Sequence, residues 1–530
     1  MRSGVLAKLL LATGMMHGLM ALPAQLADLN PAAWGRVPPE LAVLILALLA
    51  LGPSVAGQAL RLVATLAIAL VTVLKLADLA MLESLGRRFN PVADLPLVDA
   101  SVRLLAGSLG PPAAAGAVVL AVLLLLAILW GLWWACGIWM RQAPGPAGRL
   151  AALGAGAGLV TLLALAPQRV PAPQEAVYAR DRLHLSDRSL AELQRFRIEA
   201  RTDSLDRMAD PLALIDRDVL IIFLESYGRT SFDTPFYASR HLTTLAQAQE
   251  RLQQAGLALR SGFVTSPTHG GQSWLAHGTL ANGLWIDSQI RYQAAIASGR
   301  RTLFHIAAEA GFHTAAVMPA IVRPWPEAST MGFQTILAAP DLGYRGQPFN
   351  WVTMPDQFTL AAADRLLRQK PDARNLFAQI ALISSHAPWV PVPRMVAWED
   401  LGDGTIFDDM ARAGDPPEVV WRDRDRVRRQ YRDAIGYTLQ AVLDYAARQA
   451  DDPPLMLLIG DHQAASTIGL DERREVPLHV IGPPSLVERT AEWGLTPGLV
   501  PPRDKMPLPM DSLRERILRS FSPQTGVPPA

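Results

Sequence analysis

Apolar positions follow two different patterns along the chain, one before and one after residue 168. The first part holds four stretches without a charged residue, each near or above the ~20 helical residues that cross a bilayer core. A fifth stretch is apolar apart from one lysine and one aspartate. We therefore predict five membrane-spanning helices, at residues 9–27, 41–60, 62–82, 111–140 and 150–168.

The second part alternates short runs of branched apolar residues with longer helical patterns. The run DVLIIFL at residues 218–224 is typical of a strand buried on both faces of a parallel sheet. The alternation predicts an α/β domain over residues 211–530, with a central, mostly parallel sheet. Further strands are expected at 314–318, 376–383, 455–459 and 477–481, and helices at 242–255, 302–310, 357–369, 423–449 and 511–521.

Charge supports this division and excludes several classes of protein. Residues 1–168 hold only 16 of the 97 charged side chains, which excludes a one-piece soluble enzyme. A net charge of +1 without a basic run gives no footprint for a nucleic acid. The single cysteine, Cys136, excludes disulfides within the chain and zinc sites built from cysteines.

The expected topology places the α/β domain outside the cytoplasm. The first apolar run lacks a small-residue cleavage site and is followed by more spans, so we interpret it as an uncleaved anchor. If Arg2 and Lys8 are cytoplasmic, the loops at Arg61 and at Arg141 are cytoplasmic too, and five spans put the other terminus outside. Residues 169–210 are polar and form the linker, with a helical segment.

Lys75 and Asp78 interrupt the third span and have two interpretations. Their i, i+3 spacing allows them to face each other on one side of the helix. Ionisable residues at membrane depth are costly and often functional, for example in binding a lipid headgroup. The alternative is a neutralised pair near the helix end, with the lysine reaching the interface.

Candidate chemistry gathers where the predicted strands end, as is usual in such sheets. Glu225 follows an unbroken apolar run, and an unpaired carboxylate there costs several kcal/mol unless a metal or partner neutralises it. Asp461 and His462 follow another strand and are suitable ligands for Zn²⁺ or Mn²⁺. Ser273 follows two glycines and is expected to begin a helix, whose N-terminus stabilises anionic groups.

Taken together, these motifs resemble the sulfatase branch of the alkaline phosphatase superfamily. The resemblance is to its membrane-anchored transferases: lipoteichoic acid synthase, phosphoglycerol transferases and phosphoethanolamine transferases. Glu225 in IIFLES matches a metal-binding acid, and Asp461 and His462 in LLIGDHQ match a metal-binding pair. Ser273 in GGQSWLAHGTLANG stands where the family has a nucleophilic Thr or Ser that also contacts the metal. His386 in ISSHAPW matches a substrate-binding histidine.

The resemblance implies an alkaline phosphatase/sulfatase-like domain with one divalent metal ion, Zn or Mn, with Mg as another possibility. It implies transfer of a phospho-headgroup from a membrane phospholipid to an envelope glycan or lipid, through a phospho-Ser273 intermediate. In this scheme His386 stabilises a nonbridging oxygen or passes a proton to the leaving group. The implied location is the bacterial inner membrane, with the catalytic domain on the periplasmic side.

The headgroup is expected to be phosphoglycerol ahead of phosphoethanolamine, because the cysteine-rich pattern of many phosphoethanolamine transferases is absent. Relatives that recognise glycerol phosphate present a Trp and an Arg near Arg323 and Trp325, although the Arg register is shifted here. His269 either lines the pocket or makes ordinary turn hydrogen bonds, and His479 is interpreted as structural. The alternatives are a membrane-tethered phosphodiesterase, phosphatase or sulfuric ester hydrolase, and a binding module with a vestigial site.

Overall fold

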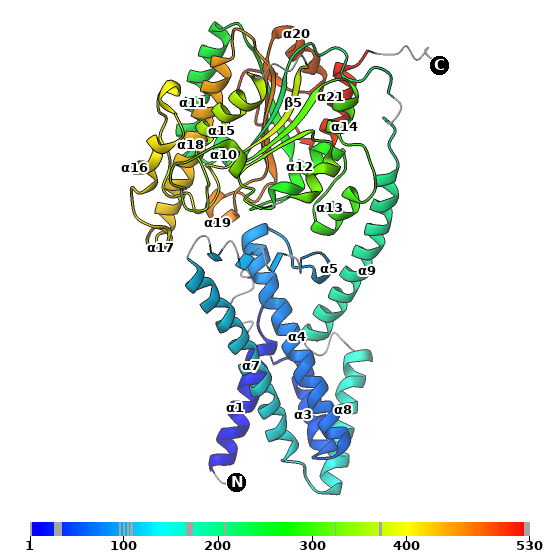
Figure 1. Ribbon diagram of the computed structural model, residues 1–530. Coiled ribbons are helices and arrows are strands. Elements are labelled where there is room, and N and C mark those ends of the chain that lie inside the picture. Colours follow the sequence, from blue (N-terminus) through cyan, green and yellow to red (C-terminus); the bar gives the residue numbers. More distant parts are fainter. Residues whose placement is uncertain are drawn as a thin grey trace, which may run out of the picture. The chain divides into compact units, whose positions relative to one another are not determined.

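The computed structural model divides into two compact units (Figure 1). The N-terminal unit consists mainly of residues before Glu192, and the C-terminal unit is chiefly Leu193–Ala530. The structure describes residues 3–25, 34–35, 37–94, 97–98, 101–102, 105–106, 110–165, 173–205, 208–323, 325–369 and 374–523.

The N-terminal unit is a helical bundle around a small apolar core. Helix α1 packs on α7, and α3 packs on α7 and α8. Three helices, α4, α7 and α8, are long and apolar enough to cross a membrane, whereas α1 and α3 are shorter apolar helices. The helices are α1 (Ser3–Met20), α3 (Pro39–Leu51), α4 (Val55–Leu85), α5 (Pro91–Asp94), α7 (Pro111–Met140), α8 (Pro146–Leu165) and α9 (Gln174–Arg201).

The boundary predicted between the second and third spans is wrong. The chain turns before the predicted boundary at residues 60–62, at residues 52–54, where Gly52 takes a positive φ of 55° and Pro53 follows it. Arg61 therefore lies inside α4 rather than in a loop, and its Nε donates to the Trp133 carbonyl at 2.9 Å. The charge of Arg61 suggested a loop at that position, but the turn forms at Gly52 and Pro53.

Lys75 and Asp78 do not pair with each other. Lys75 Nζ lies 2.5 Å from Glu175 Oε1, and Asp78 is bound by the Arg182 guanidinium and, at 2.8 Å, by the Tyr178 hydroxyl. These partners all belong to α9, so two buried charges of α4 are neutralised by a helix a hundred residues away in sequence. Both charges are neutralised, but the pair expected from their spacing does not form.

The C-terminal unit is built on one mostly parallel sheet, as predicted. Strands β4, β3, β5, β1 and β6 run parallel in that order, and β7 and β2 follow as antiparallel neighbours. The strands are β1 (Val219–Leu224), β2 (Ala258–Thr265), β3 (His313–Met318), β4 (Thr335–Ala338), β5 (Leu376–Leu382), β6 (Leu455–Gly460), β7 (Glu475–Gly482), β8 (Thr496–Pro497) and β9 (Leu508–Pro509).

Helices cover both faces of this sheet because alternate side chains of each strand point to opposite sides. In β1, Leu220 and Ile222 belong to one apolar cluster with residues of α11, α15 and α18, while Ile221 and Phe223 belong to another with residues of α12, α14 and α21. Figure 1 shows these two groups of helices on opposite sides of the sheet. The helices are α10 (Thr230–Asp233), α11 (Pro235–Gln254), α12 (Ser273–Asn282), α13 (Gln289–Ile296), α14 (Leu303–Glu309), α15 (Asp356–Ala363), α16 (Asp408–Ala411), α17 (Pro417–Val420), α18 (Arg424–Arg448), α19 (Ser466–Gly469), α20 (Pro484–Val487) and α21 (Ser512–Phe521).

Strand β2 is the main element that the apolar pattern did not predict. Its sequence ALRSGFVT carries Arg260, Ser261 and Gly262 in the middle, which hides a strand from a hydrophobicity argument. In the sheet it pairs with β7 over its full length, and Ser261 is buried against His479. Tertiary pairing, rather than local preference, makes this segment a strand.

Candidate metal centre

Two neighbouring parallel strands bring the candidate metal ligands to one edge of the sheet. Residues Leu224 and Gly460, the last of β1 and β6, stand opposite each other in the register. Glu225 and Asp461 therefore leave the sheet side by side, with His462 next in the chain. The side chains are 6%, 1% and 2% exposed, respectively, so three ionisable groups share a site without solvent.

The three side chains are close enough to hold one cation. A ligand atom from each of Glu225, Asp461 and His462 lies within 4.8 Å of the others. His462 Nε2 is 3.1 Å from Glu225 Oε1 and 3.9 Å from Asp461 Oδ2. No hydrogen bond of good geometry satisfies that nitrogen among the described residues, so a buried polar atom faces two carboxylates.

Backbone contacts hold each ligand in place and leave its free atom facing the centre. Asp461 Oδ1 accepts from the backbone amides of Ser226 at 2.8 Å and His462 at 2.6 Å, so Oδ2 remains for a cation. His462 Nδ1 lies 3.0 Å from the Gln463 carbonyl, which can only accept. The proton therefore belongs on Nδ1, and Nε2 presents its lone pair.

The electrostatics of the centre favour positive charge. Burial opposes a charged imidazolium, but the carboxylates of Asp461 and Glu225 outweigh it and raise the pKa of His462 to about 9. Burial raises the pKa of Asp461 to about 8, and the neighbouring Glu225 carboxylate acts in the same direction. Two carboxylates and an imidazole nitrogen are a donor set that Zn²⁺ and Mn²⁺ accept, so the residues fit one divalent metal.

Ser273 completes the group that the sequence predicted. Its hydroxyl donates to Glu225 Oε2 at 2.9 Å and stands at the first residue of α12. The preceding turn is held in the left-handed region, with φ 73° at Gly270 and 68° at Gln272, a conformation that costs energy for a non-glycine residue. This turn brings a hydroxyl at a helix N-terminus against the Glu225 carboxylate.

His386 lies on the loop after β5, next to the same centre. Ser385 Oγ donates to the Glu225 carbonyl at 2.6 Å and so fixes the loop to the end of β1. Burial opposes ionisation of Glu225, but the imidazoles of His462 and His386 outweigh it and hold the pKa of this carboxyl well below its ordinary value. His386 therefore lies on a loop that is fixed beside Glu225, and it acts electrostatically on that carboxyl.

The other predicted substrate residues lie farther from the centre or in its wall. His269 is buried, its backbone bridges to Gln463, and its Nε2 is 3.3 Å from the carbonyl of Asp471, a residue on a distant segment. Arg323 is exposed after β3, and Trp325 packs on Phe333 at 6.3 Å between ring centroids. Within the described part of the chain, no contact joins either one to the metal centre.

Three residues near the centre were not predicted. His277 lies one turn after Ser273, its ring packs on Phe223 at 4.1 Å, and burial lowers its pKa to about 4. Asp356 is fully buried and accepts from the backbone of Ile383 and Ser384 at 2.8 and 2.9 Å. Trp351 stacks on His386. Only His277 left a signal in the sequence, its i, i+4 spacing from Ser273.

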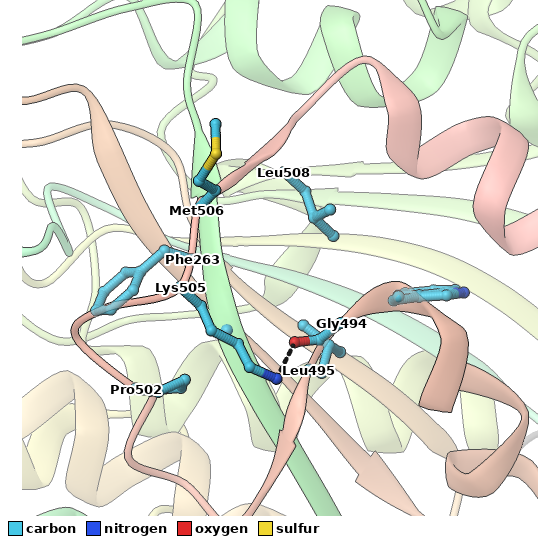
Figure 2. Close-up of a pocket in the computed structure, with 9 residues that line it drawn as sticks. Phe263, Gly494, Leu495, Pro502, Lys505, Met506 and Leu508 are labelled. Atoms are coloured by element: carbon cyan, nitrogen blue, oxygen red, sulfur yellow. Dashed lines mark hydrogen bonds between the residues drawn. The ribbon is translucent and has the colours of Figure 1, made fainter.

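A hollow of about 210 Å³ lies elsewhere in the C-terminal unit and shares no residue with the metal centre. Figure 2 shows Lys505 crossing it toward Gly494, whose carbonyl oxygen accepts from Nζ at 3.2 Å. The lining is otherwise apolar and comes from Gly262, Phe263, Trp493, Gly494, Leu495, Pro502, Lys505, Met506 and Leu508. It offers no converging polar groups for chemistry.

Comparisons with known proteins identify a family for the C-terminal unit. A profile of the sulfatase family matches residues 217–485, just over half of the chain. No match was found among curated proteins.

Solved structures similar to this chain include a synthase and two transferases. The lipoteichoic acid synthase LtaP from Listeria monocytogenes is 14% identical over 53% of this chain and 70% of its own, with a TM-score of 0.34. The phosphoglycerol transferase GacH from Streptococcus pyogenes, in complex with sn-glycerol-1-phosphate, is 14% identical. The match covers 62% of this chain and 90% of GacH, with a TM-score of 0.35. The C-terminal periplasmic domain of the phosphoethanolamine transferase EptC from Campylobacter jejuni is 10% identical. The match covers 57% of this chain and 89% of that domain, with a TM-score of 0.37. Identities this low say nothing of substrate or reaction.

Proposed function

Because the chain belongs to the sulfatase family of the alkaline phosphatase superfamily, we propose that it transfers a phospho-headgroup from a membrane phospholipid to an envelope glycan or lipid. The observation that carries the proposal is the hydrogen bond from Ser273 to Glu225, at the group formed by Glu225, Asp461 and His462. A serine hydroxyl so placed is a candidate nucleophile for the phosphorus of a headgroup ester.

The chain's own residues divide the chemistry between them. Glu225, Asp461 and His462 would hold the metal, which when bound lowers the pKa of the Ser273 hydroxyl and offsets charge on the phosphoryl group. Ser273 attacks the phosphorus and carries the phospho-headgroup, while the lipid leaves as diacylglycerol. The N-terminus of α12 faces the same region and stabilises negative charge there.

The proposed substrates follow from the membrane and from composition. A chain with helices able to span a membrane works beside a donor that is itself a lipid. We propose phosphoglycerol as the headgroup ahead of phosphoethanolamine, since the single cysteine does not fit the cysteine-rich pattern of the latter enzymes. We place the chain in the bacterial inner membrane, with the C-terminal unit on the periplasmic side.

The test is peptide mass spectrometry of the purified chain after exposure to phosphatidylglycerol vesicles with Mn²⁺. We expect a phosphoglycerol adduct on the peptide that contains Ser273, and diacylglycerol as the released product. Ser273→Ala should lower turnover by at least about a thousandfold, because no covalent intermediate can form. Ser273→Thr should retain part of the activity, since the hydroxyl survives.

Two outcomes would change the assignment. Wild-type turnover by Ser273→Ala would make a water molecule the nucleophile and defeat the covalent scheme. Release of free glycerol phosphate at the same rate with and without an acceptor such as a purified glycan would make the enzyme a hydrolase, because water then takes the acceptor's place.

A further inference from the structure

A tight turn at residues 349–352 faces the loop that carries His386. Phe349 and Val352 exchange backbone hydrogen bonds of 2.8 and 3.1 Å, which leaves Asn350 and Trp351 at the tip. Both tip residues contact the same loop: the Asn350 amide donates to the Val390 carbonyl, and the Trp351 indole stacks on the His386 imidazole. The turn is thus attached to this loop at two points.

The stacking contact is close and nearly parallel. The ring centroids of Trp351 and His386 are 3.9 Å apart and the ring planes are inclined by 20°. The edge of the imidazole is held as well, since His386 Nδ1 lies 2.6 Å from the Ala387 carbonyl. That oxygen can only accept, so Nδ1 carries a proton and Nε2 is the nitrogen left to exchange one.

We propose that Trp351 is the positioning residue that holds the His386 imidazole with Nε2 ready to move a proton during headgroup transfer. The inference rests on the proposed function and adds to it the group that orients the acid and base. An indole does not titrate, so Trp351 acts only through His386. Ring stacking restricts rotation of the imidazole about its side-chain bonds, and proton transfer depends on that orientation.

The proton movements balance over the two half-reactions. Ser273 Oγ enters the cycle as the alkoxide, after its hydroxyl proton has passed to solvent, and it is released as the alkoxide when the second half-reaction ends. In the first half-reaction, the bond from Ser273 Oγ to phosphorus forms, the bond from phosphorus to the lipid oxygen breaks, and that oxygen takes the proton from His386 Nε2. In the second, the acceptor hydroxyl gives its proton to Nε2 while its oxygen binds phosphorus, and the bond to Ser273 breaks. His386 returns to its starting state.

Two model esters distinguish a loss of proton donation by His386 from a general loss of activity. Methyl 4-nitrophenyl phosphate has a leaving group that needs no proton, whereas methyl phenyl phosphate has a poorer one that does. With the full-length chain in detergent and Mn²⁺, we expect Trp351→Leu to lower kcat for the phenyl ester about 10- to 100-fold, because a misoriented acid loses part of the roughly 10²- to 10⁴-fold that general acid catalysis contributes. We expect kcat for the nitrophenyl ester to fall only a few-fold. Trp351→Phe should restore most of the loss, because a ring still covers the imidazole.

Trp421→Leu is the matched control. Trp421 stacks on Trp389, a residue of the loop that carries His386, with 5.8 Å between ring centroids, and its indole donates to the Pro388 carbonyl. Among the described residues, Trp421 has no contact with His386 itself. Its loss should change both esters by the same factor. An equal loss for both esters with Trp351→Leu would overturn the proposal.

A measurement without turnover keeps the proposal separate from the proposed function. The indole ring current should shift the His386 ring protons upfield, and in spectra of selectively histidine-labelled protein this signal should be absent from His386→Ala and move downfield in Trp351→Leu. If wild type cleaves neither ester and shows no Ser273 adduct, the proposed function fails. If the shifted signal is missing in wild type, the positioning role fails.

Discussion

At the scale of single residues, the metal centre depends on which atoms the backbone leaves free. Asp461 gives one oxygen to two amides and keeps the other for the centre, and His462 gives one nitrogen to a carbonyl and keeps the other. The consequence is a compact donor set that is buried and oriented before any cation arrives, and this limits the reorganisation that binding requires.

Removal of one carboxylate charge should therefore affect metal and activity together. We expect Asp461→Asn to lower the affinity for Mn²⁺ or Zn²⁺ by more than about tenfold. Mutation of residues that only hydrogen-bond to a metal ligand commonly lowers metal affinity by about 10- to 100-fold. Elemental analysis of the purified variant measures the metal content, and Asp341→Asn, which alters an exposed carboxylate, serves as the control. Unchanged metal content in Asp461→Asn would place the metal elsewhere.

His479 shows that a buried histidine can be structural, as its strand neighbours predicted. Ser261 Oγ donates to the Gly498 carbonyl at 2.6 Å, so it must accept from His479 Nδ1 at 2.7 Å. Nε2 then accepts from the Tyr227 hydroxyl at 3.1 Å. Both nitrogens are used by the neutral ring, and burial of the ring disfavours its protonated, charged form.

This geometry predicts acid sensitivity of the C-terminal unit. Burial lowers the pKa of His479 to about 3, whereas a histidine in the unfolded chain titrates near 6.5. The contribution of the neutral ring is complete above pH 6.5 and is lost as the pH falls toward 3, by about 1.4 kcal/mol per pH unit. Thermal unfolding between pH 7 and 5 should show a shallower pH slope in His479→Gln, and the exposed His184→Gln should leave the slope unchanged.

At the scale of elements, α9 is more than the polar linker that its composition indicates. Its residues Glu175, Tyr178 and Arg182 neutralise both charges of α4. Two apolar helices of a bundle would pack in many registers, but buried ion pairs of this kind allow few. Their cost in desolvation is large, so each charge depends on its partner.

Loss of one partner should cost more than loss of both. Asp78→Asn leaves the Arg182 guanidinium buried without its carboxylate, and we expect a loss of about 3–5 kcal/mol in stability. The double variant Asp78→Asn with Arg182→Gln removes both charges and should recover much of this loss. Thermal stability in detergent measures both variants. Equal stability of Asp78→Asn and wild type would mean that the pair is dispensable.

At the scale of the whole molecule, the proposed reaction requires the C-terminal unit to face the periplasm. A phosphatase reporter that is active only outside the cytoplasm tests this directly. Fused after Pro173, it should be active, and fused in the turn between Arg141 and Arg149 it should be inactive. The opposite pattern would place the metal centre in the cytoplasm and contradict the periplasmic proposal, whatever the chemistry of Ser273.

The sequence alone determined the class of fold and the residues that meet at the metal centre. Long runs without charge are stable only in a bilayer or a large apolar core. In a parallel sheet, functional residues lie beyond the carboxyl ends of the strands, at one edge. Glu225, Ser273, Asp461 and His462 could be predicted to meet because each stands at a strand end or helix start. Their roles remain predictions.

Other features were decided by tertiary structure. Strand β2 forms because it pairs with β7. Lys75 and Asp78 form ion pairs with residues of α9, which their spacing in the sequence could not indicate. The stacking of Trp351 on His386 joins two loops whose sequences carry no periodic signal. The physical reason is common to all three: their energies come from contacts between distant segments, and a linear pattern reports only on neighbours.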